Sequence, residues 1–167
     1  TRTDDDSPEG RPPWTSQDMS AWIDELDHPA DLFLRIKGDD LQGLFENALY
    51  ALYSQLTDLD VVTEQEKLTL VVRAPSTREV LRALLAEALF LFDTEAFVAT
   101  RAVVTLVQPD PRRPDDDTAR ATRLAPADDR TGDDEATIEA VAHLRGNRAR
   151  SSRGSATEVK AVTYHGL

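Results

Sequence analysis

The stretch "LDHPADL", residues 26–32, holds the first side chains whose types and spacing suit chemistry. His28 and Asp31 flank a Pro-Ala step, and the apolar alternation of a strand follows, so a turn here can point Asp31 out of a sheet. A carboxylate so placed suits Ca²⁺ or Mg²⁺, which prefer oxygen ligands. It could equally accept hydrogen bonds from nearby backbone N–H groups and shape the turn. Both interpretations stay open, because one carboxylate does not make a cation site.

Other carboxylates occur where segments with helical periodicity end. Asp58 and Asp60 follow the first such segment, and Asp93 and Glu95 follow the second. They could join a shared acidic site, or they could be solvated loop charges in a chain rich in Asp and Glu. The pattern does not separate these alternatives.

The closing segment "ATEVKAVTYHGL", residues 156–167, is typical of a strand with one lysine in its middle. In a regular strand Lys160 shares a face with Val162 and Tyr164. It could contact a phosphate or a carboxylate as a compact charge, or it could protect a sheet edge from pairing. His165 is either a functional residue or a terminal histidine whose side chain finds hydrogen-bond partners nearby.

One group of arginines is the only basic cluster in the sequence. It suits contact with phosphate or with an acidic partner, but it equally suits a solvated basic loop beginning at residue 147. Its members are Arg145, Arg148, Arg150 and Arg153. His143, just before them, is predicted on the surface of a strand. The sequence contains no GxxxxGK[ST], GxSxG, HExxH or EF-hand pattern, so a stand-alone enzyme is poorly supported.

Two long amphipathic helices are the elements expected to position these residues. The first covers residues 39–58, with Asp39 as the predicted cap and Gln42 completing a capping box; the second covers residues 76–93, capped by Ser76 with Glu79. Alternating or β-branched segments predict strands at 31–38, 67–73, 97–108, 136–146 and 157–167. This order predicts an α+β fold, with two helices packed on one face of a mixed or antiparallel sheet.

Composition divides the 167-residue chain into a disordered acidic tail at 1–20 and a single domain at 21–167. A flexible acidic insertion in a long hairpin is predicted at about 108–135. The net charge of −12 argues against direct binding of a nucleic-acid backbone and suits a basic partner surface. There is no cysteine, no apolar run that could span a membrane and no secretory signal, so we expect a cytoplasmic protein.

Three stretches together resemble the archease family. They are "DHPAD" before a strand, "GLFENALYALYSQLTDLD" with "LFLFDTEAF", and the closing "EVKAVTYHGL". The resemblance covers about residues 22–107 and 136–167, and it implies an archease-like fold. It also implies a cofactor protein that activates an RtcB-type RNA ligase in tRNA splicing or RNA repair, by promoting ligase guanylylation and multiple turnover. GTP, Mn²⁺ and the histidine nucleophile would belong to the ligase, and RNA would be met only through the ligase.

The same resemblance implies a divalent-metal site. Carried over, the loop aspartate that binds metal is Asp31, and the functional lysine of "EVKA" is Lys160. Ca²⁺ is the expected ion, with Mg²⁺ and Mn²⁺ as alternatives. Pro29 stands where the family usually has Thr. The family continues past "HGL" with another strand that ends in an acidic residue, so the chain is expected to lack its final strand and the remaining metal ligands are expected beyond Leu167.

Two other function classes remain in view. One is an acidic adaptor or chaperone-like module that binds partner proteins without any ligase-specific activity. The other is a metal-dependent hydrolase built around Asp31, which lacks a second fixed ligand in the sequence.

Overall fold

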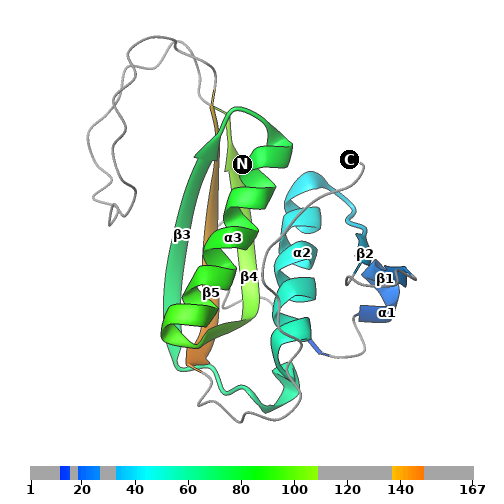
Figure 1. Ribbon diagram of the computed structural model, residues 1–167, viewed down its shortest axis with the longest axis vertical. Helices are drawn as coiled ribbons and strands as arrows, with labels where there is room; N and C mark the ends of the chain where they lie inside the picture. The colour runs from blue at the N-terminus through cyan, green and yellow to red at the C-terminus, as the bar shows by residue number, and fades with distance from the viewer. Residues whose placement is uncertain (1–11, 16–18, 27–32, 109–136, 149–167) are drawn as a thin grey trace.

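The structure is a computed structural model of the chain, and it describes residues 12–15, 19–26, 33–108 and 137–148. These residues form an α+β fold of helices with antiparallel sheets (Figure 1), which confirms the predicted class. The elements in chain order are α1 (Met19–Trp22), β1 (Ile23–Leu26), β2 (Phe33–Ile36), α2 (Leu41–Leu56), the 3-10 helix η2 (Leu59–Val61), β3 (Glu66–Ala74), α3 (Thr77–Glu95), β4 (Phe97–Val107) and β5 (Ile138–Arg148).

The first long helix, α2, forms because one stripe of its side chains is apolar. Phe45, Leu49 and Tyr53 are fully buried on that stripe. The predicted cap was wrong by one residue: Asp40, not Asp39, is the N-cap, and its carboxylate accepts a hydrogen bond from the Gly43 N–H at 2.6 Å. Both aspartates fit the sequence signal, and only the backbone conformation selects between them.

The second long helix, α3, begins at the predicted capping box. Ser76 is the N-cap; its hydroxyl oxygen accepts a hydrogen bond from the Glu79 N–H at 3.3 Å. The helix ends at Glu95, and its C-cap residue Ala96 adopts the left-handed conformation with φ 53°. It therefore runs past the predicted end, so Asp93 and Glu95 lie in its last turn rather than in the following loop.

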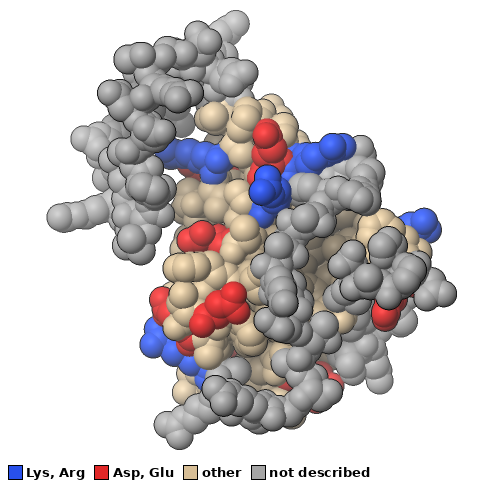
Figure 2. Space-filling model, in the orientation of Figure 1, with Lys and Arg blue, Asp and Glu red and all other residues tan. Residues whose placement is uncertain are grey.

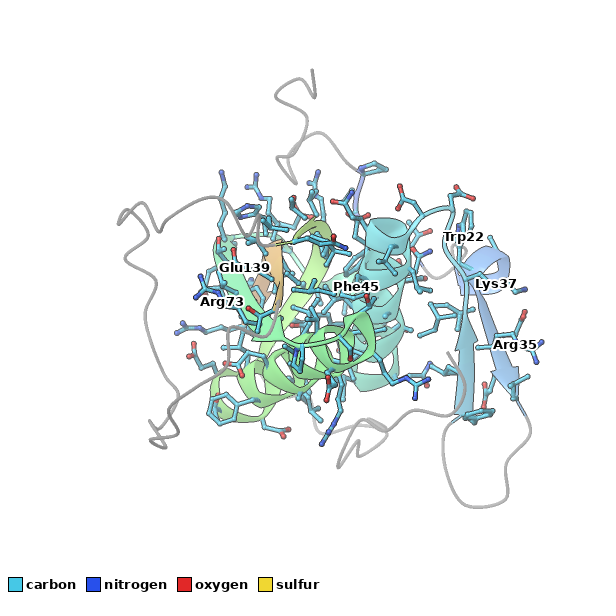
Figure 3. The ribbon with its side chains drawn as sticks, turned by 90° about the horizontal axis from the view of Figure 1, so that it is seen from above. Trp22, Arg35, Lys37, Phe45, Arg73 and Glu139 are labelled. Atoms are coloured by element: carbon cyan, nitrogen blue, oxygen red, sulfur yellow. The ribbon has the colours of Figure 1, made fainter. Side chains whose placement is uncertain are left out.

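The larger sheet has three antiparallel strands in the order β3-β5-β4. Both long helices lie over one face of it, with α3 mainly on β3 and α2 mainly on β4 (Figure 1). The strands β3 and β5 bury alternate residues beneath the helices, whereas β4 buries consecutive ones; directly paired residues such as Leu70, Ala142 and Val104 share the face under the helices. Phe45 of α2 lies in the interior between helices and sheet (Figure 3). The core is thus one layer between helices and sheet.

The strand β5 extends through Arg148, so residues 147 and 148 belong to the sheet and not to the predicted basic loop. Opposite its end, β4 carries a bulge between Ala99 and Arg101. Gly146 fits there because a Cβ at that position would lie 1.9 Å from the Val98 carbonyl oxygen. The close approach of the two backbones selects glycine.

The strands β1 and β2 form a separate antiparallel pair, in which Leu26 lies opposite Phe33. This hairpin lies on the side of α2 away from the larger sheet (Figure 1), and β2 contacts α2. The strand β1 was not predicted from the sequence. The described strands therefore form two sheets, where the sequence predicted one.

Several predictions fall outside the described residues. These concern most of the predicted tail at 1–20, nearly all of the insertion at 108–135 and the closing strand at 157–167, and the division into tail and domain stays a prediction. Within the described ranges, the Trp14 N–H donates to the Thr100 carbonyl oxygen at 2.8 Å. No helix in these ranges is long and apolar enough to cross a membrane.

Candidate functional site

The residues assigned to the metal and ligase-activating site, Asp31 and Lys160, lie outside the described residues, as do His28, His165, Arg150 and Arg153. Their roles therefore stay predictions. The structure does describe the two strands that border the segment holding Asp31. The strand β1 ends at Leu26, β2 begins at Phe33, and these two residues lie directly opposite each other.

The hairpin that borders this segment carries charges of both signs on its exposed surface. Asp24 of β1 forms an ion pair with Lys37 at 2.7 Å, and Arg35 lies directly opposite Asp24 (Figure 3). The hydrogen bond from Lys37 holds the pKa of Asp24 below its usual value. Asp24 is therefore ionised at neutral pH and is already paired with the cation of Lys37, the residue that follows β2.

The loop carboxylates proposed as a shared acidic site do not come together. Asp58 caps η2 by accepting from the Asp60 N–H at 3.0 Å, and Asp93 is exposed at the end of α3. Glu95 accepts from Arg148 at 2.9 Å. On the face shown in Figure 2, described Asp and Glu side chains lie at several separate places, and no three His, Cys, Asp or Glu residues in the described ranges could hold a metal ion together.

The two described members of the predicted basic cluster are engaged in ion pairs on β5. Arg148 bonds Glu95 and lies 3.4 Å from Glu66, while Arg145 lies 3.8 Å from Glu64. The solvated-loop interpretation is therefore wrong for Arg148, and Arg145 lies within the strand that was predicted at 136–146. Sequence spacing gave no sign of these glutamates, because they come from segments about fifty or more residues away.

A charged group with several short hydrogen bonds is centred on Glu64, which sequence analysis did not single out. Its carboxylate accepts from Arg101 Nε and Nη2, both at 2.5 Å, and from the Thr100 hydroxyl at 2.7 Å. The Glu64 side chain is 13% exposed. The Arg101 hydrogen bonds lower its pKa, against the opposing effect of burial. The charges of Glu64 and Arg101 neutralise one another. Through Arg101 of β4 and Arg145 of β5, Glu64 holds the segment that precedes β3 against these two strands.

A second missed residue is Glu46, a buried glutamate on α2. Its Oε1 accepts from the Val104 N–H of β4 at 3.0 Å, which ties the helix to the strand. The only sequence signal was a charged residue inside an apolar stripe. His143, predicted on a strand surface, does lie in β5, with Nδ1 3.1 Å from the Thr69 hydroxyl.

Comparison with known proteins identifies the family. The family described as "Archease protein family (MTH1598/TM1083)" matches residues 24–167. Protein archease of Archaeoglobus fulgidus is 32% identical over 85 residues, covering 51% of this chain and 62% of that protein. Protein archease-like of Caenorhabditis briggsae is 38% identical over 80 residues, covering 47% of this chain and 52% of that protein. The matched part thus spans less than two thirds of these relatives.

A solved structure supports the same fold. The solution structure of Methanobacterium thermoautotrophicum protein 1598 superposes with a TM-score of 0.59 at 22% identity, covering 86% of this chain and 84% of that chain. At this identity the likeness speaks for the fold alone. The resemblance found in the three sequence stretches is confirmed by the family match over residues 24–167, and this protein therefore belongs to the archease family.

Proposed function

We propose that this protein activates an RtcB-type RNA ligase in the cytoplasm, promoting guanylylation of the ligase and its multiple turnover in tRNA splicing or RNA repair. The observation that carries the proposal is the family match over residues 24–167. The lack of a phosphate-binding loop or nucleophile motif in the sequence fits a protein that assists another enzyme. Here the GTP, Mn²⁺ and nucleophile belong to the ligase.

The proposal assigns two residues of this chain to the activating site. Asp31 would supply a carboxylate oxygen to a divalent cation, Ca²⁺ first and Mg²⁺ or Mn²⁺ as alternatives. Lys160 would supply a compact positive charge that can meet phosphate or carboxylate. Among the described residues alone, no three metal-ligating side chains group together.

The direct test follows formation of the ligase–GMP adduct over time with GTP and Mn²⁺, with and without the 167-residue chain. We expect faster adduct formation and more ligation cycles per ligase molecule. Equal rates with the chain present and absent would overturn the proposal.

Site variants separate the activator from a general binding module. Asp31→Asn and Lys160→Met are expected to abolish the acceleration, whereas Asp93→Asn and Arg82→Met, which change exposed residues of α3, should leave it intact. A protein-binding adaptor would bind its partner proteins equally well in all four variants. Calorimetric titration with Ca²⁺ tests the metal separately: Asp31→Asn should weaken binding at least about tenfold, and equal affinity would remove Asp31 from the site.

A further inference from the structure

The outward face of α3 carries an exposed aromatic side chain near the C-terminal end of the helix. Phe90 is 55% exposed, and among the described residues it is the only aromatic in the set of large exposed apolar side chains. The opposite face of the helix is buried, with Val80, Leu84 and Ala88 at 0% exposure. A single exposed apolar residue is ordinary on a protein surface, so the side chains around it decide its use.

Two carboxylates flank the Phe90 ring. On a helix, residues three or four positions apart are neighbours, with about 5–6 Å between their Cβ atoms. Glu87 and Asp93 lie three positions before and after Phe90, so they stand on either side of it around the helix, and both are exposed. Ala86 is also exposed, and its small side chain leaves the ring accessible. These four residues form the α3 patch; in Figure 2, acidic side chains lie over the lower part of α3.

The two carboxylates of the α3 patch are not neutralised within the part of the chain that the structure describes. Neither Glu87 nor Asp93 has a hydrogen-bonding or ion-pair partner there. Glu95, in the same turn as Asp93, is instead paired with an arginine of β5 at 2.9 Å. The nearest arginine of α3 itself, Arg82, lies about 12 Å from Phe90 along the helix axis. The patch therefore keeps its negative charge.

The end of α3 adds to the negative potential of the patch. A helix places partial negative charge at its C-terminus, where cations are favourable and anions are not. The last turn of α3 contains no basic residue, and it contains Asp93. A positive group brought to the patch would therefore meet two carboxylates and the helix end together. The net charge of −12 favours the approach of such a group over longer distances.

An arginine side chain fits the α3 patch better than other cations do. Its planar guanidinium can stack on the exposed ring of Phe90 while its N–H groups donate to a flanking carboxylate. A metal ion fits poorly, because Glu87 and Asp93 are about 9 Å apart along the axis and on opposite sides of the ring. A second copy of the chain fits poorly as well, because facing patches would bring like charges together.

We infer that the α3 patch binds an arginine-bearing segment of a partner protein. Stacking on Phe90 supplies the preference for arginine over lysine, and Glu87 with Asp93 supply the attraction for positive charge. The inference does not depend on the proposed ligase activation, because Asp93→Asn is expected to weaken this binding and to leave that activation intact.

The probe is a fluorescein-labelled peptide, ARAARARAARA, whose binding to the 167-residue chain is followed by fluorescence anisotropy. It should bind at least about threefold more tightly than AKAAKAKAAKA, which has the same charge and no guanidinium groups. Phe90→Leu should remove this preference, because an aliphatic side chain has no ring for stacking. In two-dimensional amide NMR spectra, the arginine peptide should shift the signals of residues 86–94 of α3. Equal binding of both peptides by the unsubstituted chain, or shifts confined to other elements, would overturn the inference.

A matched pair of double substitutions separates the α3 patch from the overall charge. Glu87→Gln with Asp93→Asn should weaken binding of the arginine peptide about fivefold. Glu25→Gln with Asp39→Asn removes the same charge from exposed residues outside α3, and it should change binding by less than about twofold. Unchanged urea midpoints show that the variants fold. Equal weakening in both double variants would indicate general attraction to an acidic chain, and a dimer in light scattering that Phe90→Leu abolishes would assign the patch to a second copy; either result makes the arginine assignment wrong.

Discussion

Two buried tyrosines one helical turn apart on α2 differ in what their hydroxyl groups contact. The Tyr50 hydroxyl donates to the Thr15 carbonyl oxygen. The Tyr53 hydroxyl is buried with no hydrogen-bond partner in the described structure, and burial raises the pKa of this phenol. An unpaired buried hydroxyl costs about 1–3 kcal/mol, so Tyr53 is retained at a cost to stability.

Tyr53→Phe is therefore expected to increase the free energy of unfolding by about 1 kcal/mol, because it removes a buried polar atom and keeps the ring. Tyr50→Phe is the matched substitution and should lower it by about 1 kcal/mol, since a hydrogen bond is lost. Urea titration followed by circular dichroism measures both values. A loss of stability in Tyr53→Phe would show that this hydroxyl does have a partner.

We expect Glu64 to make the free energy of unfolding depend on pH in the acid range. The Arg101 hydrogen bonds hold its pKa below the ordinary 4.5, so its contribution is complete above pH 4.5 and is lost as pH falls through the lowered value. Glu64→Gln should cost about 1–3 kcal/mol at pH 7, and the difference from the unsubstituted protein should shrink below pH 4.5. Urea titrations from pH 7 to pH 3 test this, with exposed Glu87→Gln as the control expected to change little. A difference that stays constant with pH would show that Glu64 acts through packing alone.

At the scale of elements, the end of the larger sheet depends on how closely β4 and β5 approach. The bulge between Ala99 and Arg101 places Thr100, which is 1% exposed, within reach of Glu64. Gly146 allows the approach, since a Cβ there would lie 1.9 Å from the Val98 oxygen and 2.8 Å from the Ala99 Cα. Bulge, glycine and Glu64 thus form one structural unit.

Gly146→Ala should accordingly destabilise the protein by about 2–4 kcal/mol, because backbone atoms must move to admit the methyl group. Gly43→Ala in the first turn of α2 is the control. Its Cβ would meet only the Asp40 carboxylate at 3.2 Å, and alanine favours a helix, so little loss is expected. Thermal unfolding compares the two variants, and similar losses would contradict the close-approach argument.

At the scale of the whole molecule, the net charge of −12 shapes association with any partner. If the ligase meets this chain through a basic surface, long-range attraction speeds encounter and salt screens it. At protein concentrations below saturation, the acceleration of ligase guanylylation should fall about tenfold between 50 and 500 mM KCl. The rate of ligase alone at each salt concentration is the reference. Acceleration that does not change with salt would argue for contacts dominated by apolar surface.

Local patterns in the sequence were enough to predict the two long helices α2 and α3, the strands β2, β3, β4 and β5 and the capping box at Ser76. Amphipathic periodicity and turn chemistry act over a few residues, so one sequence displays them directly. The family followed from three short stretches, whose side chains carry the resemblance without any spatial information. The proposed site residues Asp31 and Lys160 likewise come from sequence.

Only the tertiary structure decided which distant residues meet. Glu64 bonds Arg101, Glu46 bonds the Val104 N–H, and Gly146 faces the β4 bulge, because strand register brings these positions together. The choice of Asp40 over Asp39 as cap and the extension of β5 to Arg148 were also settled there. Each depends on backbone geometry or long-range pairing, and a local pattern in one sequence carries neither.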